Sequence, residues 1–247
     1  MIMHDYNPSG TKLVLLLHPM LASGEMMYQL LGRHLGGDVR CLAPDFASHG
    51  DERGTEFTGA AAEADKIMEY LREQGIDHVD LAYGASLGGV VLTRLLERGL
   101  SFSTAFFEGT SFFENARLLT KIVGSKFVQK HRRAAADHER AVQAMGKLYG
   151  DRFTEEFADQ FISMSEDSIR GIAASCGDNR HVSLSPEDQK KCVFAYGSKD
   201  FNVSKAKPGC KKYYPHARFI LWKEYGHCEK ITADTVEYVS LLKGYLK

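Results

Sequence analysis

The chain has 247 residues, of which 44% are hydrophobic and 26% charged, and its formal net charge is −1. This composition is typical of a folded domain with a sizeable core, and the near-neutral charge gives no general attraction for nucleic acid or an anionic membrane. The longest apolar run, residues 13–17, is far too short to cross a bilayer. We therefore expect neither a membrane span nor a nucleic-acid partner.

The N-terminus and the cysteines indicate a cellular compartment. Residues 1–8 contain no Lys or Arg and no long apolar core, so no signal peptide is predicted. The five cysteines are an odd, scattered set without a Cys-x-x-Cys pair, which predicts reduced thiols in a cytoplasmic protein. Neither a Cys/His metal motif nor a glycine-rich dinucleotide motif occurs, so no metal and no cofactor are expected.

The first hundred residues alternate between apolar strands and a helical pattern. This alternation predicts a parallel sheet with crossover helices. The predicted strands are residues 13–17, 39–43, 79–83 and 104–107, and the predicted helix is residues 58–71. The run Leu13–Leu17 is apolar throughout, as expected for a strand that is covered on both faces.

The pattern changes after the fourth predicted strand. Residues 111–178 contain no convincing strand and are predicted to be several helices, after which strands return at 192–196 and 218–221. A closing helix is expected from Ala233 to Leu246, with Val236, Val239, Leu242 and Leu246 on one side. No linker composition separates domains. We therefore predict a single domain, residues 1–247, with its core at about 1–110 and 184–247 and a helical cap at about 111–183.

The segment Gly84–Gly89 reads Gly-Ala-Ser-Leu-Gly-Gly and lies between a predicted strand and an apolar helical pattern. A Gly-x-Ser-x-Gly motif in this context predicts a sharp turn that exposes the serine hydroxyl above the sheet. The glycines supply the clearance that such a turn needs. Ser86 is therefore the candidate nucleophile, against the alternative of a glycine-rich turn with an incidental serine.

A serine hydroxyl needs an adjacent base, normally a histidine that a carboxylate orients. Asp200 and His227 each follow a later predicted strand, and in an α/β sheet such loops meet at the carboxyl ends of the strands. Glu108 also follows a strand end and is a rival for the acid. Cys228, next to His227, is interpreted as a structural residue.

Attack on a carbonyl also needs two backbone N–H groups for the oxyanion. One is expected to be that of Leu87, directly after the candidate nucleophile, and the other to come from the loop His18-Pro19-Met20-Leu21 after the first predicted strand.

These residues resemble the α/β-hydrolase superfamily over essentially the whole chain. The resemblance rests on five segments: His18-Pro19-Met20, Asp45 with His49-Gly50, Gly84 to Gly89, Gly197 with Asp200, and Gly226-His227. It implies an α/β-hydrolase fold, a mostly parallel sheet flanked by helices, with the cap inserted after the fourth predicted strand.

The resemblance also implies site roles. Ser86 is the nucleophile, His227 the base, Asp200 the orienting acid, and Met20 and Leu87 the oxyanion donors. Pro19 replaces a glycine that members usually carry, but the donor is the following N–H, which Met20 retains. His49 and His18 are interpreted as scaffold residues, the latter orienting the oxyanion loop.

Two features of the cap have open interpretations. The first is the role of its apolar side chains: they pack the cap on the core, or they line an acyl pocket together with Met20, Met26 and Met27. The apolar side chains of the cap are Phe112, Phe113, Leu118, Leu119, Phe157, Phe161, Ile162 and Met164. Between Arg117 and Arg152, nine basic residues against three acidic ones form a solvated helix face or attract an anion or a membrane.

The expected function is that of a serine hydrolase cleaving a small or medium carboxylic ester through an acyl-enzyme, with a small-molecule ester as its partner. Two alternatives stay open. One is a ligand receptor or slow-turnover binding protein that retains the triad. The other is a non-hydrolytic enzyme of this fold that cleaves a carbon–carbon bond.

Overall fold

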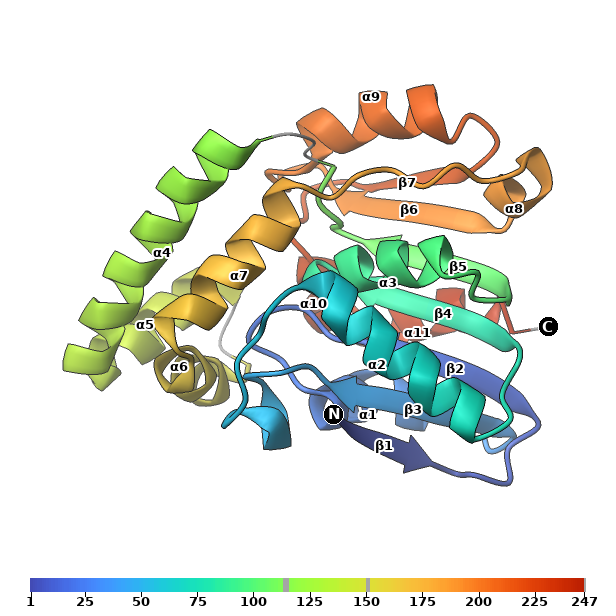
Figure 1. Cartoon of the computed structure of the whole chain (residues 1–247), viewed down its shortest axis with the longest axis horizontal. Coiled ribbons are helices and arrows are strands. Elements are labelled where there is room, and N and C mark those ends of the chain that lie inside the picture. The colour runs from blue at the N-terminus through green and yellow to red at the C-terminus, as the bar shows by residue number, and fades with distance from the viewer. Residues whose placement is uncertain (113–115, 150–151, 247) are drawn as a thin grey trace.

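The computed structural model describes residues 1–112, 116–149 and 152–246 (Figure 1). Its centre is a seven-stranded sheet in the order β1-β3-β2-β4-β5-β6-β7. Strand β1 pairs antiparallel with β3, and the other neighbouring pairs are parallel. The strands are β1 (Ile2–Tyr6), β2 (Lys12–Leu17), β3 (Val39–Asp45), β4 (Val79–Ala85), β5 (Phe102–Glu108), β6 (Cys192–Gly197) and β7 (Arg218–Trp222). The predicted α/β class with a mostly parallel sheet is confirmed.

The central strands are apolar at successive positions because helices cover both faces of the sheet. In β2, Leu15 and Leu17 belong to one hydrophobic cluster and Val14 and Leu16 to the other, and all four are fully buried. The first cluster is covered by α2 (Ala60–Glu73), α3 (Leu87–Glu97) and α9 (Val203–Tyr213), and the second by α1 (Gly24–Leu30), α10 (Glu229–Ala233) and α11 (Thr235–Lys243). In Figure 1, α2 and α3 lie in front of the sheet, α9 lies above β7 at the top of the view, and α1 and α11 lie behind the sheet.

A group of helices is inserted between β5 and β6, as predicted for the segment after the fourth expected strand. The group comprises α4 (Arg117–Ala136), α5 (His138–Tyr149), α6 (Thr154–Ser163) and α7 (Glu166–Gly177). These helices gather beside one end of the sheet (Figure 1). The short helix α8 (Pro186–Lys190) then leads into β6, and the 3₁₀ turns are Gly32–His34 and Gly50–Glu52. The boundaries at 111 and 183 stay a prediction.

Hydrogen bonds from cap side chains to core main chain hold α6 and α7 in place. The Gln160 side chain accepts from the Gly50 amide at 3.1 Å and donates to the Ser48 carbonyl at 2.6 Å. Ser168 Oγ accepts from the Phe57 amide at 3.0 Å, and Ser175 Oγ accepts from the Ala60 amide at 3.2 Å. The cap is thus joined to the loops that follow β3.

The structure differs from the sequence-based expectations at three points. Strand β1 was not predicted, because its partly polar sequence lies at the sheet edge and is only partly buried. The expected closing helix is two helices, α10 and α11, separated by Asp234, whose φ of −131° and ψ of 50° are not helical. Val236 was wrongly placed on the buried side; it is 87% exposed, whereas Val239 and Leu242 are buried. Within the described residues, no helix is long and apolar enough to cross a membrane.

Candidate active site

Ser86 lies in the turn between β4 and α3, in a backbone conformation that side chains rarely adopt. Its φ is 49° and its ψ is −109°. Its amide donates to the Glu108 carbonyl at 2.8 Å, which fixes the turn to the end of β5. Backbone strain of this kind costs about 1–3 kcal/mol and persists only where the surroundings enforce it.

The glycines of this turn are needed because other main-chain atoms lie too close to them for a side chain. A Cβ on Gly84 would lie 2.6 Å from the Gly88 carbonyl oxygen, and one on Gly88 would lie 2.1 Å from the Leu17 carbonyl oxygen. Neither position accepts a side chain without moving main chain. The motif thus lets α3 begin directly against the end of β2.

The loops that carry Asp200 and His227 are attached to each other. The Lys199 amide donates to the Tyr225 carbonyl at 2.9 Å. A Cβ on Gly197 would lie 2.1 Å from that same carbonyl oxygen, so the close approach requires glycine there. The segments after β6 and β7 therefore form one unit that positions both side chains.

The structure brings Ser86, His227 and Asp200 together in a continuous hydrogen-bonded chain. His227 Nε2 lies 2.9 Å from Ser86 Oγ, and His227 Nδ1 lies 2.9 Å from Asp200 Oδ2. Asp200 is 2% exposed, and its other oxygen accepts from the Asn202 amide at 2.8 Å. Since the carboxylate accepts at Nδ1, the imidazole keeps its Nε2 lone pair toward the serine hydroxyl.

The amides predicted as oxyanion donors lie in neighbouring segments. Leu17 pairs with Gly84 in the sheet, so the loop after β2 and the turn after β4 start side by side. Leu87 is the first residue of α3, where N–H groups have no partner within the helix. Met20 is partly buried on the same side of the sheet as α3. Neither amide donates to an acceptor within the described part of the chain.

His18 holds the loop that contains Met20. The Phe46 amide donates to His18 Nε2 at 3.0 Å, so the ring proton is on Nδ1, which donates to the Pro19 carbonyl at 2.8 Å. Burial lowers the pKa of His18 to about 4, which keeps the ring neutral. The scaffold role expected for this histidine agrees with its hydrogen bonds.

His49 is fully buried and lies away from the Ser86–His227 chain. It bonds the Ala47 carbonyl through Nδ1 at 3.0 Å, and its ring centroid is 4.9 Å from that of His18. Burial, followed by the neighbouring His18, lowers its pKa to about 3. These contacts fit a scaffold residue rather than a base.

The rival acid Glu108 points away from His227. Its Oε2 accepts from Tyr238 Oη at 2.9 Å and from Trp222 Nε1 at 3.3 Å, on the side of the sheet that α11 covers. Burial raises its pKa to about 8. Cys228 lies beside it, with Sγ 3.8 Å from the Glu108 carbonyl oxygen, and burial raises the thiol pKa well above its usual value. A thiol with so high a pKa is not a nucleophile at neutral pH.

The three methionines suggested for an acyl pocket do not lie on one face of the sheet. Met26 and Met27 contribute to the cluster beneath α1, whereas Met20 belongs to the cluster on the cap side. In the cap, Phe161 and Met164 are buried in packing against the core. Phe113 lies outside the described residues, and the side chains of Leu118 and Leu119 are also outside them.

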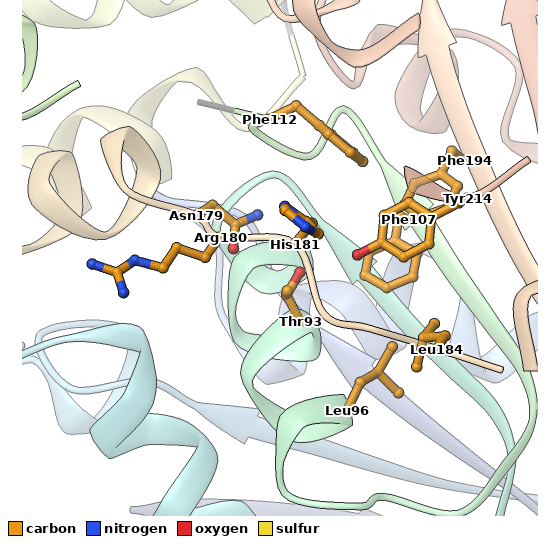
Figure 2. A pocket seen from close by; sticks show the side chains of 10 residues that line it. All are labelled: Thr93, Leu96, Phe107, Phe112, Asn179, Arg180, His181, Leu184, Phe194 and Tyr214. Carbon is orange, nitrogen blue, oxygen red and sulfur yellow. The ribbon is translucent and has the colours of Figure 1, made fainter. Parts of the chain in front are cut away.

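Phe112 lies in a separate narrow pocket between α3 and the segment that leads into β6. Figure 2 shows it opposite Phe107, Phe194 and Tyr214, with the Arg180 side chain directed away. The Phe112 ring centroid is 5.5 Å from that of Phe194. None of Ser86, Asp200 and His227 lines this pocket.

Within the described residues, one group of side chains has metal-ligand atoms within 4.8 Å of one another: His4, Asp45 and Asp51. The Asp45 oxygens already accept from His4 and from the amides of Gly24 and Asp51, at 2.7–3.0 Å. These bonds tie the loop after β3 to β1 and α1. The arrangement is thus explained by the fold.

One residue beside the site was missed from the sequence. Phe201 directly follows Asp200, is 68% exposed, and has its ring centroid 4.5 Å from that of His227. Its position next to the candidate acid was the only available signal, and that signal does not predict exposure.

Comparison with known proteins shows the family of the chain. The sequence profile of the alpha/beta hydrolase family matches residues 14–203, and the chain therefore belongs to that family. No curated protein matches it in sequence.

Solved structures of the same fold cover nearly the whole chain. A protein assigned to the alpha/beta hydrolase family from Desulfitobacterium hafniense has a TM-score of 0.77 at 14% identity, with 100% of both chains covered. An esterase (EaEST) from Exiguobacterium antarcticum has a TM-score of 0.73 at 16% identity, covering 99% of this chain and 94% of its own. The serine hydrolase CCSP0084 from Cycloclasticus zankles has a TM-score of 0.69 at 21% identity, covering 98% and 92%.

Proposed function

We propose that the protein is a serine hydrolase that cleaves a small or medium carboxylic ester through an acyl-enzyme. The observation that carries the proposal is the chain of two 2.9 Å contacts, from Ser86 Oγ to His227 Nε2 and from His227 Nδ1 to Asp200 Oδ2. The proposed roles are nucleophile for Ser86, general base and acid for His227, and orienting carboxylate for Asp200.

In the first half-reaction His227 takes the Ser86 proton as Oγ attacks the carbonyl carbon. The carbonyl oxygen becomes an oxyanion, and the Met20 and Leu87 amides donate to it. Collapse of the tetrahedral intermediate breaks the bond to the alcohol oxygen, which receives the proton from His227. The alcohol leaves, and the acyl group stays on Ser86.

In the second half-reaction His227 activates water, which attacks the acyl carbon, and Ser86 leaves with the proton. The imidazolium formed in each half is stabilised by Asp200, which is buried and accepts at Nδ1. No step requires a cofactor. The proposed compartment is the cytoplasm, supported by five free cysteine thiols.

The test uses a fluorophosphonate probe and p-nitrophenyl esters with C2 to C12 acyl chains. We expect labelling of the wild type, no labelling of Ser86→Ala, and steady turnover that is fastest for short to medium chains. Labelling followed by a single slow turnover would favour a receptor, and labelling without any ester turnover would favour carbon–carbon cleavage. Absence of labelling would reject the proposed nucleophile.

A further inference from the structure

Phe201 is an exposed aromatic side chain between two buried residues. It is 68% exposed, whereas Asp200 and Asn202 on either side are 2% and 3% exposed. Single exposed apolar side chains are common on soluble proteins, so what sets Phe201 apart is that its exposed ring lies against the imidazole of His227, with the ring centroids 4.5 Å apart.

The main chain beneath Phe201 is fixed on both sides. The Asp200 amide donates to the Gly197 carbonyl at 3.1 Å, and the Val203 amide donates to the Asp200 carbonyl at 3.1 Å. Asn202 Nδ2 donates to the Gly109 carbonyl at 2.8 Å, which ties the turn to the end of β5. The ring is therefore presented from a fixed turn, and little main-chain conformational entropy remains to be lost when a ligand contacts it.

The Phe201 ring lies against the imidazole that handles the leaving group. The ring centroids are 4.5 Å apart and the ring planes are inclined by 36°. Protonation of the alcohol requires its oxygen to come within hydrogen-bond distance of His227 Nε2. The carbonyl oxygen, in contrast, is directed to the Met20 and Leu87 amides. The group attached to the leaving oxygen is thus the part of an ester that comes within reach of Phe201.

From this arrangement, and resting on the proposed function, we infer that Phe201 is a specificity-determining residue that selects esters of apolar, aromatic alcohols. An aromatic leaving group stacks on the exposed ring and removes both surfaces from water, and aromatic pairs contribute beyond the area that they bury. A small alcohol cannot reach the ring and gains nothing from it. Since the acyl-enzyme has lost the alcohol, Phe201 acts on acylation and not on deacylation.

The experiment compares benzyl acetate with methyl acetate, which leave the same acetyl group on Ser86. We expect Phe201→Ala to lower kcat/KM for benzyl acetate about tenfold and to change that for methyl acetate less than about twofold. Phe201→Tyr should retain the preference and Phe201→Leu should lose most of it. Phe127→Ala, at a 38% exposed phenylalanine on α4, is the control and should change neither substrate.

Deacylation supplies the second measurement. The rate at which isolated acetyl-enzyme is hydrolysed should be the same in Phe201→Ala and in the wild type. An equal loss of kcat/KM for both acetates, or a slower deacylation, would make Phe201 a positioning residue for His227 and overturn the inference. Unchanged kinetics for both acetates would also overturn it. Fluorophosphonate labelling distinguishes failure of this inference from failure of the proposed function. If the proposed function is wrong, the wild type itself is not labelled.

Discussion

Gly109 lies directly against the imidazole of His227. A Cβ on Gly109 would come within 3.0 Å of His227 Cε1, 2.9 Å of Cys228 Sγ and 3.1 Å of Asp200 Oδ2. Its φ of +60° also disfavours any side chain. Gly109, the residue directly after β5, therefore shapes the floor beneath the Asp200–His227 pair.

Gly109→Ala should reduce ester turnover by displacing the imidazole. Since misplacement of a catalytic group by about 1 Å can cost about 10²-fold, we expect kcat/KM to fall by roughly that factor. Gly75→Ala is the matched control, because Gly75 has φ +66° but nothing within 4 Å of an added Cβ. Both variants should lose about 1 kcal/mol of unfolding free energy from backbone strain. Equal activities in the two would contradict the steric argument.

Ser86→Gly and Ser86→Ala should both be inactive but should differ in stability. Each removes the hydroxyl that contacts His227, whereas only glycine relieves the strained φ of 49° and ψ of −109°. We expect Ser86→Gly to be more stable than Ser86→Ala by about 1 kcal/mol. Urea unfolding followed by circular dichroism measures the difference. A more stable alanine variant would show that the turn is unstrained.

Substitutions of Asp200 and Glu108, the two carboxylates at strand ends, should have very different effects on activity. Asp200→Asn leaves the shape intact but removes the charge that stabilises the imidazolium, and in a serine protease triad the equivalent change costs about 10⁴-fold. Glu108→Gln should keep kcat/KM within about threefold, because Glu108 bonds Tyr238 and Trp222 instead of His227. Burst and steady-state assays with p-nitrophenyl acetate give both values. The reverse order would make Glu108 the acid.

Glu108 should also impose a pH dependence on stability. Its pKa of about 8 in the folded protein exceeds the ordinary 4.5, so the folded state holds a proton that the unfolded state releases. Its contribution is present below pH 4.5 and is lost as pH rises through about 8. Between pH 6 and 8 the wild type should lose about 2 kcal/mol relative to Glu108→Gln. A constant difference between the two proteins would contradict the buried, protonated carboxyl.

The neutral imidazoles of His18 and His49 should destabilise the fold in acid. Their pKa values in the folded protein are about 4 and 3, below the ordinary 6.5, so the unfolded state binds more protons. Stability should therefore fall as pH drops below 6.5, with His18 alone costing about 2 kcal/mol by pH 5. Urea unfolding of Glu108→Gln at pH 7, 6 and 5 measures this loss of stability. The variant is used because Glu108 in the wild type has the opposite effect, raising stability as the pH falls. A constant unfolding free energy would argue against neutral buried rings.

The fold is predictable from the sequence where the spacing of the apolar residues matches the burial of the strand or helix. Residues 13–17 are identifiable as a strand because both faces of β2 are buried, and apolar side chains are then needed at each position. Strand β1 fails this criterion, since an edge strand that is only partly buried tolerates His4 and Asp5. Val236 shows the opposite error: it lies in the first turn of α11, in the same helix as the buried Val239 and Leu242, and helical spacing alone does not reveal that its side chain faces solvent.

The site is predictable where topology brings strand ends together. Ser86, Asp200 and His227 could be chosen because each follows a strand, but Glu108 satisfies the same rule. The alternation of side chains along β5 decides between the carboxyls, since Phe106 and Glu108 share the face that α11 covers. The exposure of Phe201 follows from the turn geometry, which no local pattern encodes.

The hydrogen bonds that join α6 and α7 to the core affect how far the loop sequences can diverge in evolution. Gln160, Ser168 and Ser175 contact main-chain amides or carbonyls of the loops beneath them. Main-chain carbonyls are present in all amino acids and main-chain amides in all except proline, so most substitutions in these loops leave the attachment intact. The polar part of this attachment thus requires only three side chains on the helices, beside the apolar packing of residues such as Phe161 and Met164.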